Sequence, residues 1–225
     1  MSALAVKQRF DSLLADWQSR PEPERVPTGI PEIDQATGGV PRGALTEICG
    51  PASSGRTTLL VSIMAEAAAR EEYCALVDAE DSFDPASARE AGVRLDRLLW
   101  VQCGHNAEHA LKAADLLVQG GGFGLVAMDL GETPPETARR ISLTSWFRLR
   151  RAVEHTPTAL VSLALEANAK TCATLVVELR RERAAWSGER GPAGSPSHLL
   201  RAVTVRVSSE RRSKVCSPVF TARAI

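Results

Sequence analysis

The feature that most constrains this chain is a glycine-framed loop, GPASSGRTT, at residues 50–58. The apolar run Ala44–Cys49 leads directly into Gly50, and apolar residues recur at helical spacing after Thr57. A strand, a glycine-rich loop and a helix in this order let successive backbone amides cradle phosphate oxygens. The chain is therefore expected to fold around a parallel sheet that ends in an anion-binding loop.

The residues of this loop have distinct expected roles in holding a nucleotide. Gly50 and Gly55 allow the backbone angles that aim amides at phosphate, and the helix start adds partial positive charge. Thr57 supplies the hydroxyl expected on Mg²⁺, whereas Arg56 stands where the pattern normally carries lysine. The predicted nucleotide-binding residues are Gly50, Pro51, Ala52, Ser53, Ser54, Gly55, Arg56, Thr57 and Thr58.

Strand-length apolar runs recur along the rest of the chain, at 44–49, 73–77, 98–102, 125–129, 159–165, 173–179, 202–207 and 219–222. Helix-length segments separate the first four, which indicates a parallel sheet with crossover helices. The later runs have shorter connections, which favours antiparallel strands at one edge. The sequence predicts an α/β fold: a mainly parallel twisted sheet, helices on both faces, and antiparallel strands added at one edge.

The first 27 residues differ in pattern from the rest. Residues 2–18 form one apolar stripe at helical spacing, made by Phe10, Leu13, Leu14 and Trp17. The stripe can pack on its own domain or dock on another protomer or partner. Prolines in the segment 20–27 then break any helix and indicate a linker. The expected organisation is a short N-terminal helix with its linker (1–27) and a core domain (28–225).

Composition limits the function classes. Lys plus Arg (27) equals Asp plus Glu (27), so no global field attracts nucleic acid, although basic residues outnumber acidic ones from Thr171 onward. The five cysteines include no C-x-x-C pair, which is typical of a reduced, cytoplasmic protein. Neither a signal peptide nor a membrane span is expected, because apolar residues never form a long uninterrupted run.

Two other patterns concern a possible metal site and a possible nucleic-acid surface. His105 and His109 have helical i, i+4 spacing, but capping or solvated histidines are favoured over a zinc site because the H-E-x-x-H pattern is missing. Arginines surround Trp146 and Phe147, which suits either a stacking face for a polynucleotide or the solvated side of a helix, and the helix is favoured. The arginines are Arg139, Arg140, Arg148, Arg150 and Arg151.

Two carboxylates are expected at the same sheet edge as the loop. Asp129 ends the apolar run LVAMD, and Glu80 ends the stretch CALVDAE. Carboxyl ends of parallel strands meet at one edge, so both side chains should approach the loop. A glutamate there can polarise an attacking water as a general base.

The chain resembles the core of the RecA superfamily. The resemblance lies in three stretches in the family's order: TGIPEIDQATGGVPRGALTEICGPASSGRTTL, ALVDAEDSFDPASAREAGVRLDRLLWVQ and GLVAMDLGETPP. It runs from about Thr28 to Ile225. The resemblance implies an ATP or ADP site with Mg²⁺: residues 50–58 match the Walker A loop, Asp129 the Walker B carboxylate beside Thr57 on the metal, and Glu80 the catalytic glutamate.

Departures from that family change the expectation. The guanidinium of Arg56 is larger and more planar than an ammonium, and a displaced cation can reduce phosphoryl transfer by orders of magnitude. Leu165 lies at or next to the place of a glutamine that senses the γ-phosphate. The two DNA-binding loops shrink to about 131–135 and 166–171. We expect no ATPase activity or a very weak one, a vestigial Glu80, and no strand exchange.

The last likenesses concern partners. The closing strands resemble those of RecA, including a basic turn that reaches a neighbour's nucleotide or DNA; here it holds Arg211, Arg212 and Lys214, and a solvated hairpin tip is the alternative. The stretch PTGIPEIDQATGGVPRGALTEI is similar to ImuA, the RecA-like accessory factor of damage-induced (SOS) mutagenesis and translesion synthesis.

Three functions follow from these likenesses. The first is a DNA-repair assembly module that binds protein partners: a Y-family-type polymerase subunit, RecA or itself, with weak DNA contact at most. The second is a DNA-dependent ATPase, and the third is a DNA-binding protein that ignores nucleotide.

Overall fold

A computed structural model describes residues 7, 9, 23–186, 200–211, 214–216 and 219–223. Its centre is a nine-stranded sheet with the order β10-β9-β8-β3-β7-β6-β4-β5, in which β11 also pairs with β9. Strands β3 to β8 are parallel to their neighbours among themselves, and β9, β10 and β11 pair antiparallel at one edge. The strands are β3 (Ala44–Cys49), β4 (Cys74–Asp78), β5 (Leu98–Gln102), β6 (Leu125–Leu130), β7 (Ala159–Ala164), β8 (Leu175–Trp186), β9 (Leu200–Arg211), β10 (Lys214–Cys216) and β11 (Val219–Arg223).

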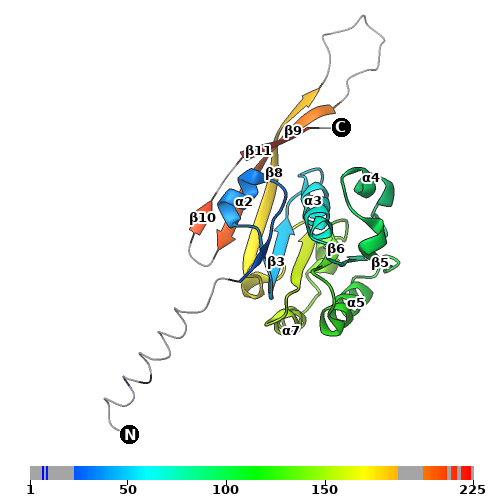
Figure 1. The fold of residues 1–225 in the computed structure, drawn as a ribbon, viewed down its shortest axis with the longest axis vertical. Coiled ribbons are helices and arrows are strands. Elements are labelled where there is room, and N and C mark those ends of the chain that lie inside the picture. The colour runs from blue at the N-terminus through cyan, green and yellow to red at the C-terminus, as the bar shows by residue number, and fades with distance from the viewer. Residues whose placement is uncertain are drawn as a thin grey trace, which may run out of the picture.

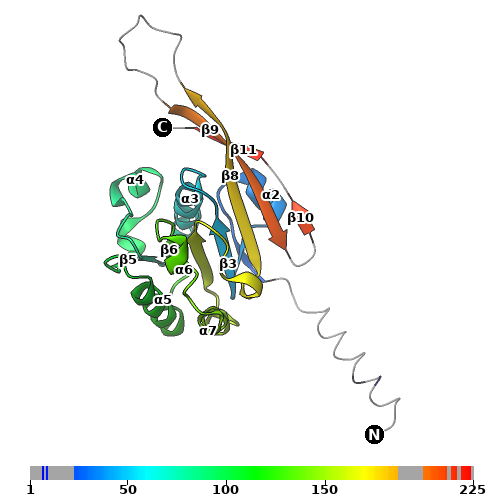
Figure 2. The same cartoon turned by 180° about the vertical axis from the view of Figure 1, so that it is seen from behind.

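Helices cover both faces of the sheet, as Figures 1 and 2 show from opposite sides. Alternate residues of a strand enter different apolar clusters: Leu125 and Ala127 pack with α3, whereas Val126 and Met128 pack with α5 and α7. Burial on both faces explains why these strands read as continuous apolar runs. The helices are α2 (Pro31–Thr37), α3 (Arg56–Ala69), α4 (Pro85–Glu90), α5 (Ala107–Gly120), α6 (Pro135–Ala138) and α7 (Leu143–Val153), with 3₁₀ turns η1 (Leu95–Arg97) and η2 (Lys170–Cys172). The predicted α/β fold is confirmed.

The folded core begins before residue 28. β1 (Arg25–Val26) pairs antiparallel with β2 (Val40–Pro41), and Val26 is fully buried. The guanidinium of Arg25 donates to the carbonyl of Gly39 over 2.9 Å. The sequence pattern assigns these two residues to the linker because prolines surround them, but pairing with β2 draws them into the core.

One sequence expectation lies largely outside the described residues. Of the segment 2–18, which carries the apolar stripe, only residues 7 and 9 are described. Within the part that the structure describes, no helix is both long enough and apolar enough to cross a membrane.

Helix α7 resolves one alternative left open by the sequence. Trp146 and Leu149 are buried against the sheet, so this side of the helix is core. Phe147 stays 41% exposed, and the arginines on either side of it are on the outer surface or only partly buried. Arg148, Arg150 and Arg151 are therefore on the solvated side of a packed helix, with the ring of Phe147 left on that side, whereas Arg139 and Arg140 precede α7.

Trp146→Ala should cost about 3–5 kcal/mol of unfolding free energy, because it leaves a cavity between α7 and the sheet. Phe147→Ala should cost less than about 1 kcal/mol, because much of that ring is already solvated. Urea denaturation of both variants tests the difference. Equal losses would show that the two aromatic rings are not divided between core and surface.

Candidate nucleotide site

Four adjacent parallel strands end at one edge of the sheet, which we call the rim: the carboxyl ends of β3, β7, β6 and β4 with the loops that follow them. The strand register shows that these strand ends lie at nearly the same height in the sheet. Cys49 and Leu130 both pair with Ala164, and Asp129 pairs with Asp78. The loop 50–58, the segment after Asp129 and the turn that carries Glu80 therefore leave the sheet side by side.

The glycine-framed loop has the backbone that the sequence predicts. Gly50 has φ +152°, and a Cβ there would lie 2.2 Å from the carbonyl oxygen of Leu179, so no larger residue fits. Gly55 takes φ +94° as the N-cap of α3 and has no side chain with which to cap the first amides of this helix. Ser53 also has a positive φ of 58°. Uncapped helical amides at the end of such a loop suit an anion.

Arg56 does not point into the loop but across the rim. Only 5% of the residue is exposed. Its Nη1 donates to the carbonyl of Gly131 over 2.9 Å, and its Nη2 lies 3.7 Å from Oε1 of Glu132. The cation at the lysine position thus holds the loop that follows β6, while Thr57 and Thr58 remain exposed beside it.

Asp129 is the most perturbed carboxylate of the rim. Burial raises its pKa to about 6, and the negative charge of Asp78 adds to this shift. The Gly131 amide, which donates to Oδ1 of Asp129 over 2.7 Å, and the Arg56 guanidinium oppose it. Asp129 is therefore held by the same loop that Arg56 holds.

Glu80 has two partners that sequence reasoning missed. Thr133 donates its hydroxyl to Oε1 over 2.8 Å, and Nδ1 of His105 lies 3.0 Å from Oε2. The side chain of His105 is 70% exposed, in agreement with a solvated histidine, and Asn106 caps α5 by accepting from the amide of His109. The nearness of Glu80 to His105 depends on how the turns after β4 and β5 fold, which no local pattern reveals.

Two further carboxylates at this edge are structural. Asp78 is fully buried and accepts hydrogen bonds from the amide of Phe83 and the indole of Trp100. Glu47, also fully buried, accepts from the amides of Asn168 and Ala169 over 2.6 and 3.1 Å. Burial raises the pKa of the Glu47 carboxyl, and these two hydrogen bonds oppose that rise. Glu47 thereby anchors the segment after β7.

The segments after β6 and β7 are short. Four residues separate β6 from α6, and only η2 interrupts the connection from β7 to β8. Leu165 follows β7 directly, and its carbonyl accepts from the amide of Gly50 over 3.2 Å. Leucine therefore occupies the rim position beside the loop at which the family resemblance would place a glutamine that senses the γ-phosphate.

The rim fits a phosphate better than it fits a metal ion. The loop supplies a close backbone approach at Gly50 and free amides at the start of α3. Asp129, however, has little exposed surface, already accepts from Gly131, and lies near a guanidinium whose charge opposes that of a cation. These residues do not form a good Mg²⁺ site as they stand, and the roles of Thr57 and Glu80 toward a nucleotide stay predictions.

The basic C-terminal turn lies far from this rim. Arg211 ends β9 opposite Leu175, near the amino half of β3, and Lys214 pairs with it from β10. Figure 1 shows this end of β9 pointing away from the loop before α3. Arg212 lies outside the described residues. Any contact between this turn and a nucleotide would have to involve another protomer.

The chain is similar in sequence to known proteins. The family model described as the RecA N-terminal domain matches residues 12–133, more than half of the chain. "Protein RecA" of Rhodospirillum rubrum is 46% identical over 108 residues, which are 47% of this chain and 29% of that protein. The same protein of Paramagnetospirillum magneticum is 47% identical over 110 residues (48% and 30%), and that of Cutibacterium acnes is 45% identical over 106 (46% and 30%). The similarity spans less than a third of these relatives' lengths.

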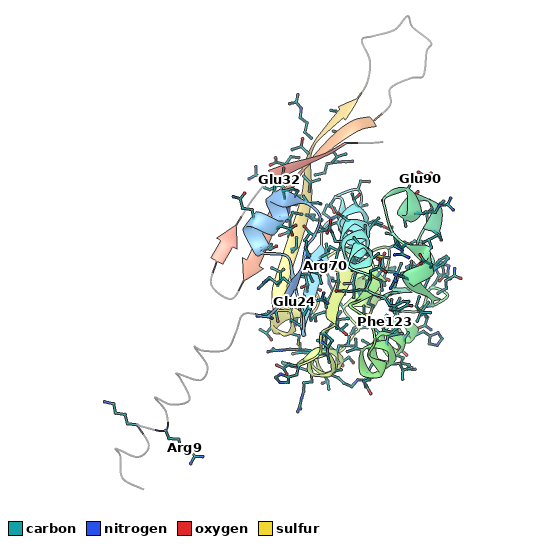
Figure 3. All side chains as sticks on the ribbon, in the orientation of Figure 1. Arg9, Glu24, Glu32, Arg70, Glu90 and Phe123 are labelled. Carbon is teal, nitrogen blue, oxygen red and sulfur yellow. The ribbon has the colours of Figure 1, made fainter. Side chains whose placement is uncertain are left out.

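The raised pKa of Asp129 predicts a pH dependence of stability. Between about pH 4, where an unfolded aspartate ionises, and about pH 6, the folded chain holds a proton that the unfolded chain has lost, so stability falls as pH rises. Asp129→Asn should remove this fall and be more stable than the parent at neutral pH, by roughly 1–3 kcal/mol. Glu90→Gln, at an exposed position on α4 (Figure 3), should change stability by less than about 0.5 kcal/mol. Denaturation across this pH range tests both, and parallel parent and Asp129→Asn curves would contradict the expectation.

Proposed function

The chain belongs to the RecA family, and from this premise we propose that it is an accessory protein of bacterial DNA repair that assembles other proteins and does not turn over nucleotide. The ImuA-like stretch 27–48 supports a place in damage-induced translesion synthesis in the cytoplasm. Its partners there would be a Y-family-type polymerase subunit, RecA or a second copy. In this proposal the core domain comprises 28–225 together with β1 (Arg25–Val26), and a docking helix with its linker precedes it.

The position of Arg56 carries this proposal. Phosphoryl transfer needs a cation on the transferred group and a metal beside it. Here the guanidinium is buried against the carbonyl of Gly131 and the carboxylate of Glu132. Recruiting it to a phosphate would break both contacts, and Mg²⁺ at Asp129 would meet its positive charge. The loop can hold ATP or ADP through its amides while the groups for turnover are engaged elsewhere.

The shortened loops support the same proposal. The segment after β7 is fixed to Glu47 through the amides of Asn168 and Ala169, so it has little freedom to respond to a nucleotide or to DNA. The basic strands are also partly neutralised, because Arg180 pairs with Glu178 and Arg206 pairs with Glu182. Strong DNA binding is therefore not favoured by these strands.

A DNA-dependent ATPase is the second candidate, and the geometry of Glu80 favours it. Glu80 lies on the rim, hydrogen bonded to Thr133 and His105, in a place suited to orient a water. In that case Arg56 would have to leave Gly131 when nucleotide binds.

Calorimetry with ATP and ADP, with and without Mg²⁺, tests the proposal together with a hydrolysis assay. We expect nucleotide affinity that depends little on Mg²⁺ and no hydrolysis above background, with or without single-stranded DNA. Arg56→Lys should not restore turnover, because the sensor position holds Leu165. Turnover by the parent chain that Glu80→Gln abolishes would replace the proposal with the ATPase.

A further inference from the structure

Helix α7 exposes an apolar pair that its own fold does not use. Leu143 and Phe147, one turn apart, are 43% and 41% exposed, and they are two of the five large apolar residues exposed in the described part of the chain. Figures 1 and 2 both show α7 beside α5, and the two helices are in contact. The exposed pair therefore borders a surface built from two packed helices, away from the rim.

A groove of about 570 Å³ runs between these helices; we call it the α5–α7 groove. Phe147 is its one aromatic lining residue, and Arg148 and Arg151 stand beside it. The lining residues are Gln119, Thr144, Phe147, Arg148, Arg151 and Ala152. The 11-residue helix α7 is about 16 Å long. The α7 residues that line the groove run from Thr144 to Ala152, about 12 Å along the helix axis, which matches about two turns of a third helix laid along it.

Positive charge predominates on the α7 side of the groove. Helix α7 carries three arginines and no acidic residue, in a chain whose formal net charge is zero. Arg148 is 3.4 Å from Asp115 of α5, and Arg150 donates to the carbonyl of Thr171. Among the described residues, no hydrogen bond or ion pair is found for the side chain of exposed Arg151. The edge of the groove thus carries the unpaired positive charge of Arg151 next to the apolar ring of Phe147.

We propose that the α5–α7 groove docks an acidic amphipathic helix of a partner protein; this inference rests on the assembly role proposed above. One apolar residue of that helix would pack on Phe147 in the groove, and a second, one turn away, on Leu143 at the exposed start of α7 outside the groove lining. The flanking carboxylates of the helix would face Arg148 and Arg151. Exposed phenylalanine and arginine are the residue types enriched at such interfaces.

A single-stranded nucleic acid fits this surface less well. Polynucleotide tracks combine a continuous basic path with several stacking aromatics. The groove has one aromatic ring, and Asp115 already neutralises part of the charge on Arg148. The same surface suits carboxylates presented by a helix with an apolar side.

The test is a selection of helical peptides of two to three turns from a display library, with both charge and apolar positions randomised, against the full chain. Selected peptides are expected to be acidic with apolar residues at i and i+4. Their affinities are then measured by fluorescence anisotropy at low and high salt, and binding should weaken as salt increases. A labelled oligothymidine is titrated in parallel.

Variants locate the binding. Arg151→Glu and Phe147→Ala should each weaken the selected peptides by about tenfold or more. Arg70→Glu, the same charge reversal at an exposed position ending α3 (Figure 3), should leave affinity within about twofold. Peptides without acidic bias, affinities unchanged in both groove variants, or displacement of the peptide by oligothymidine would overturn the inference. Nucleotide hydrolysis by the parent chain would overturn the proposed function and leave these affinities unaffected, so the two failures are distinguishable.

Discussion

The contact between the Arg56 guanidinium and the Gly131 carbonyl is the interaction on which the rim depends. It joins the first turn of α3 to the segment after β6, so the two halves of the candidate site are held by one side chain. A buried cation needs compensation, and here Glu132 and the nearby Asp129 provide it together with the carbonyl. The Arg56 side chain thus links the two segments of the rim by a contact within the chain.

The acidic groups of the rim follow the same principle. Asp78, Glu80 and Asp129 each accept hydrogen bonds from within the chain. Burial without such partners would be costly, and with them each carboxylate becomes part of the turn it stabilises. A site built in this way is held by the chain's own hydrogen bonds, which is compatible with the proposed assembly role.

The connections after β6 and β7 are short and are anchored by hydrogen bonds within the chain. Because these short segments are hydrogen bonded to Arg56 and to buried Glu47, that edge of the sheet is closely tied to the core. The solvent-facing side of α7, with Phe147 among its arginines, lies outside this constrained region. Assembly through a helix surface and restraint at the rim are therefore compatible in one domain.

The amino-acid sequence by itself determined the parallel sheet, the loop at 50–58 and the common edge of Asp129 and Glu80, because strand burial and glycine backbone freedom are local properties. Only the tertiary structure decided where Arg56 points, that Thr133 and His105 reach Glu80, that β2 draws Val26 into the core, and that Trp146 is buried while Phe147 is not. Those outcomes depend on contacts between residues that are distant in the chain or on which side of a helix meets the sheet. Periodicity and spacing do not encode either.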